Sequence, residues 1–219
     1  DAGVRDTRVM LALPLRRTGM ADVERGEQTD TAARYRAVAR EVRDNNVDTA
    51  NNSAFVEIGE PRLRLLLDTK DFSEHTCIGI ARVTEKRPDQ KVVLDEQYLP
   101  PCLDCRGVPA LNGFVAELLG LLHQRGDALA DRVVGGGTAR AAALDLAQFM
   151  RLQAVNRFEP LFAHLAVMQC LHPETLYQIA LQMAGEMATF TDKVKRRPPA
   201  FPAYDHDDLQ STFAPLMRE

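Results

Sequence analysis

Two cysteines in the segment Pro101-Cys-Leu-Asp-Cys105 form the sharpest chemical motif of this 219-residue sequence. Pro-Cys-x-x-Cys is half of the zinc-deaminase signature, in which thiolates and a His or Cys hold zinc and a Glu transfers protons. The other half, His-x-Glu, should lie upstream on a helix, whereas the sequence offers His75-Thr-Cys77 within a strand-like pattern. A thioredoxin-like redox role needs a βαβ pattern, which the sequence lacks. We therefore expect neither a deaminase nor a dithiol oxidoreductase.

A structural zinc site is the alternative that this motif leaves open. His75, Cys77, Cys102 and Cys105 offer nitrogen and sulfur ligands of the kind that tetrahedral zinc prefers. Structural zinc sites usually pair two tight ligand clips, however, and His-x-Cys is an unusual clip. We predict that Cys102 and Cys105 are partly buried structural residues, and that the chain has no catalytic residue, metal ligand or cofactor. A zinc-binding enzyme or module centred on these two cysteines is kept as the alternative.

The remaining candidate motifs favour structural roles. His123 and His164 fall within helical patterns, where a single His is more often solvated or hydrogen-bonded than a metal ligand. Gly135-Gly-Gly-Thr138 resembles a phosphate loop only superficially, because a Walker loop follows a strand and has a Lys where Gly137 stands. The basic run Lys193-Val-Lys-Arg-Arg197 has no interleaved aromatic residues, so a solvated linker is favoured over a nucleic-acid patch. No recognisable nucleophile elbow or triad pattern is present, and we predict that the chain is not an enzyme.

Composition and charge point to an ordinary globular protein without a nucleic-acid or membrane partner. The sequence is 45% hydrophobic and 26% charged, with a net charge of −4 and a pI near 5.8. An acidic balance gives no electrostatic attraction to nucleic acid or to an anionic membrane. No apolar run approaches the roughly 18 residues of a spanning helix, so we predict no direct membrane insertion. Four Cys without regular spacing favour a reducing compartment, which is the cytoplasm.

Residues 1–105 are predicted to form short strands with polar turns. The stretch Arg62-Leu-Arg-Leu65 alternates polar and apolar side chains, as a strand with one buried face does. Turn-forming residues lie at Asp44–Ser53, Gly59-Glu-Pro61 and Arg87-Pro-Asp89. The predicted strands fall within Arg8–Arg17, Arg34–Arg40, Phe55–Ile58, Arg62–Leu67, Cys77–Val83 and Val92–Leu94. This pattern predicts an antiparallel β-sandwich that lacks its first strands.

Residues 106–219 change to helical spacing. Pro109 suits the first turn of a helix, Gly135–Gly137 is expected to end that helix, and Thr138 to cap the next. Pro160 is expected to kink or restart the second helix. A third helix should follow Pro173, and a last one should start near Asp205. Each of the first three predicted helices has apolar residues along one side. In the first they are Leu111, Val115, Leu118, Leu122 and Leu129; in the second, Leu144, Phe149, Leu152 and Val155; and in the third, Leu176, Ile179, Met183, Met187 and Phe190. We predict an α+β chain whose second half is an up-and-down four-helix bundle.

The ends of the sequence suggest an internal piece of a longer protein. The chain opens without an initiator Met and reaches a strand-like run at Arg8 almost at once. Its last residues, Phe213-Ala-Pro-Leu-Met-Arg-Glu219, end without a helix stop signal. We therefore expect further domains on the natural protein.

Four ordered stretches resemble the TssK family, the baseplate subunits of the bacterial type VI secretion system. Each stretch is weak alone, and the ordered set spans nearly the whole chain. The first is Arg8-Val-Met-Leu-Ala-Leu-Pro14, the second is Glu60–Asp68 with Ile78–Val83, and the third is Leu94–Cys102. The fourth combines Val155–Pro160, Leu171-His-Pro-Glu174, Phe201–Leu209 and Thr212-Phe213.

The resemblance implies a structural adaptor without catalytic residues. Such a subunit is expected to be a homotrimer with a β-sandwich shoulder, a four-helix neck and a C-terminal head. Residues 1–105 would be an incomplete shoulder and residues 106–219 the neck. The shoulder is expected to bind the wedge subunits TssF, TssG and TssE. The membrane complex would be reached only through the head, outside this sequence, at the cytoplasmic side of the bacterial inner membrane.

The helical half is rich in large apolar residues, which leaves two interpretations open. These residues either pack within one bundle or partly bury against neighbouring protomers. They are Phe158, Phe162, Leu165, Met168, Met183 and Met187.

Overall fold

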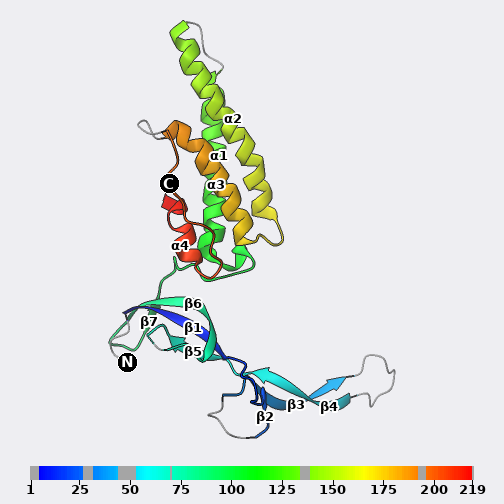
Figure 1. The fold of residues 1–219 in the computed structure, drawn as a ribbon. Coiled ribbons are helices and arrows are strands. Elements are labelled where there is room, and N and C mark those ends of the chain that lie inside the picture. Colours follow the sequence, from blue (N-terminus) through cyan, green and yellow to red (C-terminus); the bar gives the residue numbers. More distant parts are fainter. Residues whose placement is uncertain are drawn as a thin grey trace. The chain divides into compact units, whose positions relative to one another are not determined.

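The computed structural model describes residues 5–26, 32–43, 53–69, 71–133, 139–191 and 196–218, without side chains at 133, 139–145 and 191. The chain divides into two compact units, Asp1–Asp95 and Glu96–Glu219, which are treated separately below. The first unit contains β1 (Arg5–Pro14), β2 (Val23–Glu24), β3 (Tyr35–Arg43), β4 (Ser53–Pro61), β5 (Arg64–Leu67), β6 (His75–Lys86) and β7 (Val92–Leu94) (Figure 1). The second contains the 3-10 turns η1 (Cys105–Gly107) and η2 (Leu216–Arg218) and the helices α1 (Pro109–Val133), α2 (Ala139–Val167), α3 (Pro173–Thr191) and α4 (Leu209–Phe213).

A four-stranded antiparallel sheet in the order β5-β1-β6-β7 occupies most of the first unit. Leu11 on the inner strand β1 lies opposite both Leu65 and Ile78, so the three side chains form one row on the same face. The next row contains Ala12, which is fully buried. Leu65 is 67% exposed and Ile78 is 41% exposed. One apolar face of this sheet is therefore open among the described residues.

The second sheet, in the order β2-β3-β4, differs from the prediction in two respects. β2 pairs with β3 in parallel, so the pairing is not antiparallel throughout. The predicted turn at Gly59-Glu-Pro61 is instead the end of β4, where Gly59 lies opposite Ala37. A Cβ at Gly59 would come within 3.3 Å of the Tyr35 Cβ, so glycine makes room for the aromatic ring rather than bending the chain. Stacking of the two sheets as a sandwich stays a prediction.

The helices of the second unit follow the sequence pattern closely. α1 begins at Pro109, as predicted, and α2 packs against both α1 and α3. α2 continues as one helix through Pro160, which corrects the expectation of a restart there. Pro160 is exposed, so the distortion caused by its missing N–H falls on the solvent side of the helix. The predicted helix end and cap at Gly135–Thr138 lie outside the described residues.

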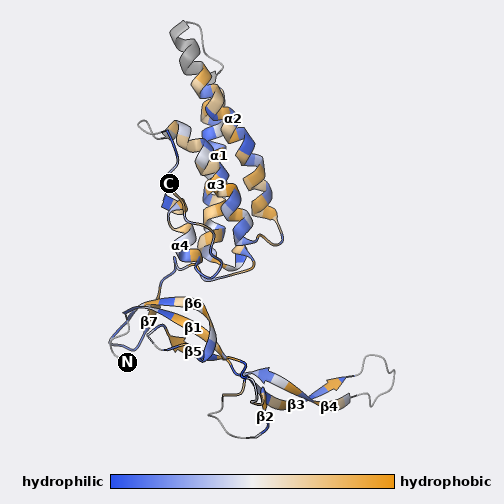
Figure 2. Ribbon diagram, viewed as in Figure 1, coloured by the Kyte–Doolittle hydropathy of each residue, from blue (hydrophilic) through white to orange (hydrophobic). Residues whose placement is uncertain are grey.

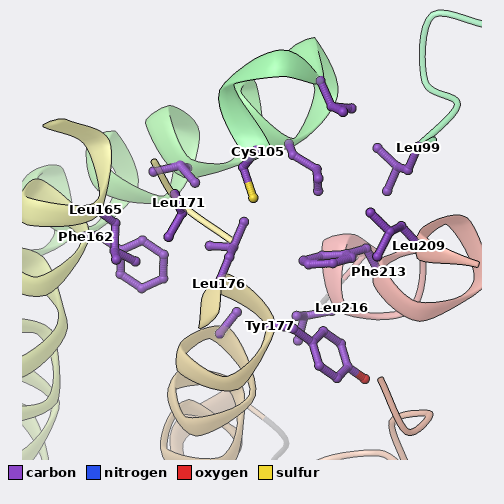
Figure 3. Packing of buried hydrophobic residues seen from close by; sticks show 14 of the residues in the cluster. Leu99, Cys105, Phe162, Leu165, Leu171, Leu176, Tyr177, Leu209, Phe213 and Leu216 are labelled. Carbon is purple, nitrogen blue, oxygen red and sulfur yellow. The ribbon is translucent and has the colours of Figure 1, made fainter. Parts of the chain in front are cut away.

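One apolar cluster forms the core of the second unit (Figure 3). It joins the three long helices to Leu99 before them and to α4 and η2 after them. Hydrophobic residues recur along α1, α2 and α3 (Figure 2). Phe149, predicted to face the core, is instead 54% exposed. The most deeply buried large residues include Leu99, Leu111, Phe162, Leu176, Tyr177, Leu209 and Phe213.

The fourth helix is shorter than expected. α4 has five residues, and its N-cap is Asp208, whose side chain accepts a hydrogen bond from the Ser211 N–H. The sequence placed its start near Asp205, three residues early. The up-and-down four-helix bundle stays a prediction, because three long helices and this short one are what the described residues contain. No helix in the described part of the chain is long and apolar enough to cross a membrane.

Two apolar residues of α2 test this core. Phe162→Ala is expected to lower the free energy of unfolding of the helical unit by about 3–5 kcal/mol, because Phe162 is fully buried in the cluster. Val167→Ala should change it by less than about 0.5 kcal/mol, because the Val167 side chain is 76% exposed on the same helix. Urea unfolding followed by circular dichroism at the helical band would measure both. Equal losses in the two variants would contradict this assignment of the core.

Candidate functional site

The four cysteines are free thiols in different surroundings. Cys77 lies with His75 on β6 of the first unit, whereas Cys102 and Cys105 belong to the second unit. Cys105 is only 1% exposed, and its sulfur points into the apolar cluster (Figure 3). In the part of the chain that the structure describes, no group of three or more His, Cys, Asp or Glu residues could hold a metal ion.

Burial makes the Cys-x-x-Cys pair a poor nucleophile. It raises the pKa of the Cys105 thiol to about 12, and the neighbouring Cys102 and Asp104 add to this effect. Burial also raises the pKa of Cys102. Both sulfurs therefore carry little of the reactive thiolate at neutral pH. A structural role for the pair stays a prediction.

Asp104, between the two cysteines, ties this segment to the α2–α3 connection. Its Oδ1 accepts hydrogen bonds from the Arg106 N–H at 3.1 Å and from the Leu171 N–H at 3.3 Å. The Cys105 N–H donates to the Leu171 carbonyl at 2.8 Å. The hydrogen bond from the Arg106 backbone, followed by that from Leu171 and the Arg106 guanidinium, lowers the pKa of Asp104. These bonds satisfy both the N–H and the carbonyl of Leu171, within the connection. We call this arrangement the Asp104 junction.

A second polar cluster joins the start of α3 to the segment before α4. The Tyr177 hydroxyl donates to the Pro202 carbonyl at 2.5 Å. Tyr204 Oη and His206 Nδ1 are hydrogen-bonded at 2.7 Å, and the His206 ring stacks on His172 with centroids 5.3 Å apart. The Glu174 N–H donates to His172 Nδ1 at 3.2 Å. Residues separated by some thirty positions are therefore brought together for packing.

Two hydroxyl groups of this region have structural partners. Burial raises the pKa of Tyr204 to about 12, with the nearby Glu174 as the next cause. Thr212 is buried, and its hydroxyl donates to the Asp208 carbonyl at 2.9 Å and accepts from the Asp205 N–H at 3.2 Å. A buried hydroxyl with a donor and an acceptor partner stabilises a fold.

His123 is the one titratable group whose surroundings the sequence reading underestimated. Its Nδ1 donates to Glu159 Oε1 at 2.8 Å, and its Nε2 lies 3.8 Å from Asp127 Oδ2, four residues along α1. The hydrogen bond to Glu159, followed by the charge of Asp127, raises the pKa of His123. Asp127 at i+4 was the signal available in the sequence. His164 lies exposed on α2, as expected for a solvated residue.

The other predicted motifs give no site. Gly135–Thr138 and residues 193–195 lie outside the described residues, and Arg196 and Arg197 are exposed. The sequence analysis did not predict the structural hydrogen bonds of Asp104 and Tyr177. The bonds of Asp104 could have been anticipated locally, since Asp before a turn is a common cap. The hydrogen bond from Tyr177 to Pro202 could not, because it depends on a tertiary contact.

Thiol reactivity should follow burial. In the native protein we expect Cys170, which is exposed, to react first with iodoacetamide and Cys105 to react last. The raised pKa of Cys105 removes the thiolate, and its burial removes access. Peptide mass spectrometry over a time course would give the order, and elemental analysis of the same sample should find far less than one zinc per chain. Stoichiometric zinc that is lost in Cys102→Ser would contradict both expectations.

His123 should make the stability of the helical unit depend on pH. Because its pKa is raised in the folded state, the stabilisation is fully present below its ordinary pKa of 6.5 and is lost as the pH rises through the folded value. His123→Gln should therefore lower the urea midpoint at about pH 6 and leave it nearly unchanged at about pH 9. His164→Gln is the matched control on α2. A His123→Gln effect that is the same at both pH values would refute the assignment.

The whole chain resembles proteins of one known family. The family model described as Bacterial Type VI secretion, VC_A0110, EvfL, ImpJ, VasE matches residues 1–219. Type VI secretion system baseplate component TssK1 of Pseudomonas aeruginosa is 47% identical over 218 residues, which are 99% of this chain and 48% of that protein. The chain thus spans about half the length of this curated relative.

Two solved structures extend the likeness to the fold. A crystal structure of TssK matches all of this chain and 50% of its own, with a TM-score of 0.88 and 38% identity. A chain of the cryo-electron microscopy structure of a type VI TssK-TssF-TssG baseplate subcomplex matches 98% of this chain and 67% of its own, with a TM-score of 0.80 and 25% identity. The chain therefore belongs to the TssK family of type VI secretion baseplate components, whose members are structural proteins rather than enzymes.

Proposed function

We propose that this chain is the shoulder and neck of a structural adaptor in the type VI secretion baseplate, which connects wedge proteins to the membrane complex. We assign residues 1–95 to the shoulder and residues 96–219 to the neck, rather than dividing them at residue 105, because Leu99 and Cys105 belong to the helical core. The likeness to TssK over the whole chain, at a TM-score of 0.88, is the observation that carries this proposal. Contact with the membrane complex belongs to a head domain outside residues 1–219.

The two sheets of the first unit are assigned to an incomplete antiparallel sandwich, and the helices to a four-helix neck. The open apolar face around Leu65 and Ile78 supports the sandwich, because a sheet face of this kind normally packs against a second layer. The shared core of α1, α2, α3 and α4 supports the neck.

The β3–β4 ribbon is the part of the shoulder that we assign to the wedge subunits TssF, TssG and TssE. The TssK structure in a TssK-TssF-TssG subcomplex supports TssF and TssG as the partners. Each strand of the ribbon has nine residues, and its far half is exposed on both faces. A two-stranded ribbon is marginally stable alone in water, so a partner would stabilise it. Phe55 on β4 is 77% exposed and could supply an aromatic anchor.

Self-association as a homotrimer is assigned to the neck. Leu146, Phe149 and Met150 on α2 are all exposed and lie close together along one side of the helix. Apolar side chains exposed together favour burial against another chain. The assembled subunit would act at the cytoplasmic side of the inner membrane, without nucleic acid and without inserting into the bilayer.

A pull-down of TssF and TssG with the tagged chain tests the wedge assignment. Phe55→Ser should reduce recovery at least about tenfold, because an exposed aromatic anchor is lost while the fold needs no contact from it. Leu103→Ser, at a similarly exposed apolar position in the second unit, should leave recovery unchanged.

Light scattering and circular dichroism on the same samples provide the controls. Both variants should keep the mass of a trimer and the same helical signal. Equal recovery of the wedge proteins by Phe55→Ser and the parent chain would reject the ribbon as the contact. A monodisperse monomer at micromolar concentration would reject the trimer.

A further inference from the structure

An open apolar groove of about 680 Å³ lies among the helices of the second unit. α1, α2 and α3 all line it, together with η2 and the segment before α4. Its apolar side chains include Phe114, Leu118, Leu121, Met183, Phe201 and Met217. Its volume lies within the range of sites that bind a ligand specifically, and none of the assigned functions uses it.

Four arginines line this apolar surface, Arg125, Arg132, Arg151 and Arg218. No ion pair joins any of them to a residue in the part of the chain that the structure describes. Two other arginines of the same unit are paired, Arg106 with Asp104 and Arg157 with Glu186. The groove therefore brings together four guanidinium groups without an ion pair among the described residues.

This positive charge runs against the charge of the unit as a whole. Residues 96–219 contain 11 Lys and Arg and 14 Asp and Glu, which gives 11 − 14 = −3. Glu117 is the one acidic side chain among the residues that line the groove. The groove is therefore a local cationic site on an acidic surface, which favours an anionic occupant.

Buried polar atoms at the same place also lack partners. Arg151 Nε and Gln148 Oε1 are buried without a hydrogen bond among the described residues, and both side chains line the groove. The rest of the Arg151 guanidinium is held in place, since its Nη2 donates to the Phe190 carbonyl at 3.3 Å and it lies over the Phe190 ring. The wall of the groove at Gln148 and Arg151 is therefore incompletely hydrogen-bonded among the described residues.

The shape of the groove suits a polypeptide. Its lining residues on α1 run from Phe114 to Arg132, which is ~27 Å at about 1.5 Å per residue. They recur at helical spacing, with Phe114, Leu118 and Leu121 before Arg125 and Arg132. An elongated apolar floor with charges at one end matches an amphipathic helix better than a compact small molecule.

We propose that the groove docks an acidic amphipathic helix of a partner protein. Apolar side chains of that helix lie on the floor between α1 and α3, and its Asp and Glu side chains pair with Arg125, Arg132, Arg151 and Arg218. Arginine binds carboxylates through paired hydrogen bonds, which fixes the orientation of the helix. The surface proposed for trimer contacts, Leu146, Phe149 and Met150, does not line the groove. The docking site is thus separate from both the trimer and the wedge assignments.

A fluorescein-labelled peptide of eighteen residues is a direct probe. It has Leu at positions i, i+4, i+7 and i+11 and Glu at the flanking positions, and fluorescence anisotropy with the full 219-residue chain measures its affinity. A control peptide in which every Glu is replaced by Lys should bind at least about tenfold more weakly. A second control, in which every Leu is replaced by Ser, should lose binding to the same extent. Binding of the Glu peptide should weaken as salt is raised, because the pairs are partly exposed.

Variants of the chain locate the binding. Arg125→Glu combined with Arg132→Glu should weaken the Glu peptide at least about tenfold, since both side chains are exposed and line the groove. Arg197→Glu is the matched control, because Arg197 is an exposed arginine of the same unit that does not line the groove. Leu121→Ser should weaken binding through the apolar floor, and Val167→Ser, at an exposed position outside the groove, should not.

Several results would overturn the proposal. They are equal binding of the Glu and Lys peptides, no binding of either, or an equal loss in Arg197→Glu. Light scattering in which only the Arg125→Glu, Arg132→Glu pair breaks the trimer would assign the groove to a second copy instead. Recovery of TssF and TssG in the pull-down does not depend on this groove, so failure of one proposal leaves the other standing.

Discussion

Burial of a single apolar cluster is the constraint on which the helical unit depends. The cluster takes Leu99 from one end of the unit and Leu216 from the other, with the three long helices between them. The Leu99 N–H donates to Gln210 Oε1 at 2.9 Å, so a backbone group at one edge is satisfied by a side chain from the far end of the sequence. Contacts over such separations carry a loop-closure cost, which the shared apolar surface offsets only when the segments pack together. The unit is therefore expected to form cooperatively.

The same burial lowers the reactivity of the residues that looked most chemical in the sequence. Cys105 looks like half of a metal clip, yet its place in the cluster raises its pKa to about 12 and leaves little thiolate. Burial raises the pKa of Tyr204 in the same way. Asp104 accepts hydrogen bonds from backbone N–H groups at the junction with Leu171, and these bonds lower its pKa. The packing around each residue, rather than its type alone, therefore decides its reactivity.

The presence of the long helices, and the row of buried apolar residues along α1, could be predicted from the sequence because both follow from local periodicity. Leu111, Val115 and Leu122 lie at helical spacing, and all three are buried. The errors fall where tertiary contacts decide the outcome. Gly59 sits in a strand because Tyr35 lies against it, and Phe149 points outward although its spacing matched the stripe. The bond between Tyr177 and Pro202, like the meeting of Asp104 with Leu171, joins residues whose proximity no local pattern encodes.

Two of the exposed apolar surfaces among the described residues differ in the charge pairs that they carry. On the β3–β4 ribbon Arg40 pairs with Glu60, and Arg25, which follows β2, pairs with Glu57 of the ribbon. At the groove between α1 and α3, no ion pair joins Arg125, Arg132, Arg151 or Arg218 to another described residue. An apolar occupant that excluded water there would bury the Arg151 guanidinium without a carboxylate, and an uncompensated buried charge costs several kcal/mol. Complete closure of the groove therefore requires an occupant that brings negative charge with its apolar face, whichever chain supplies it.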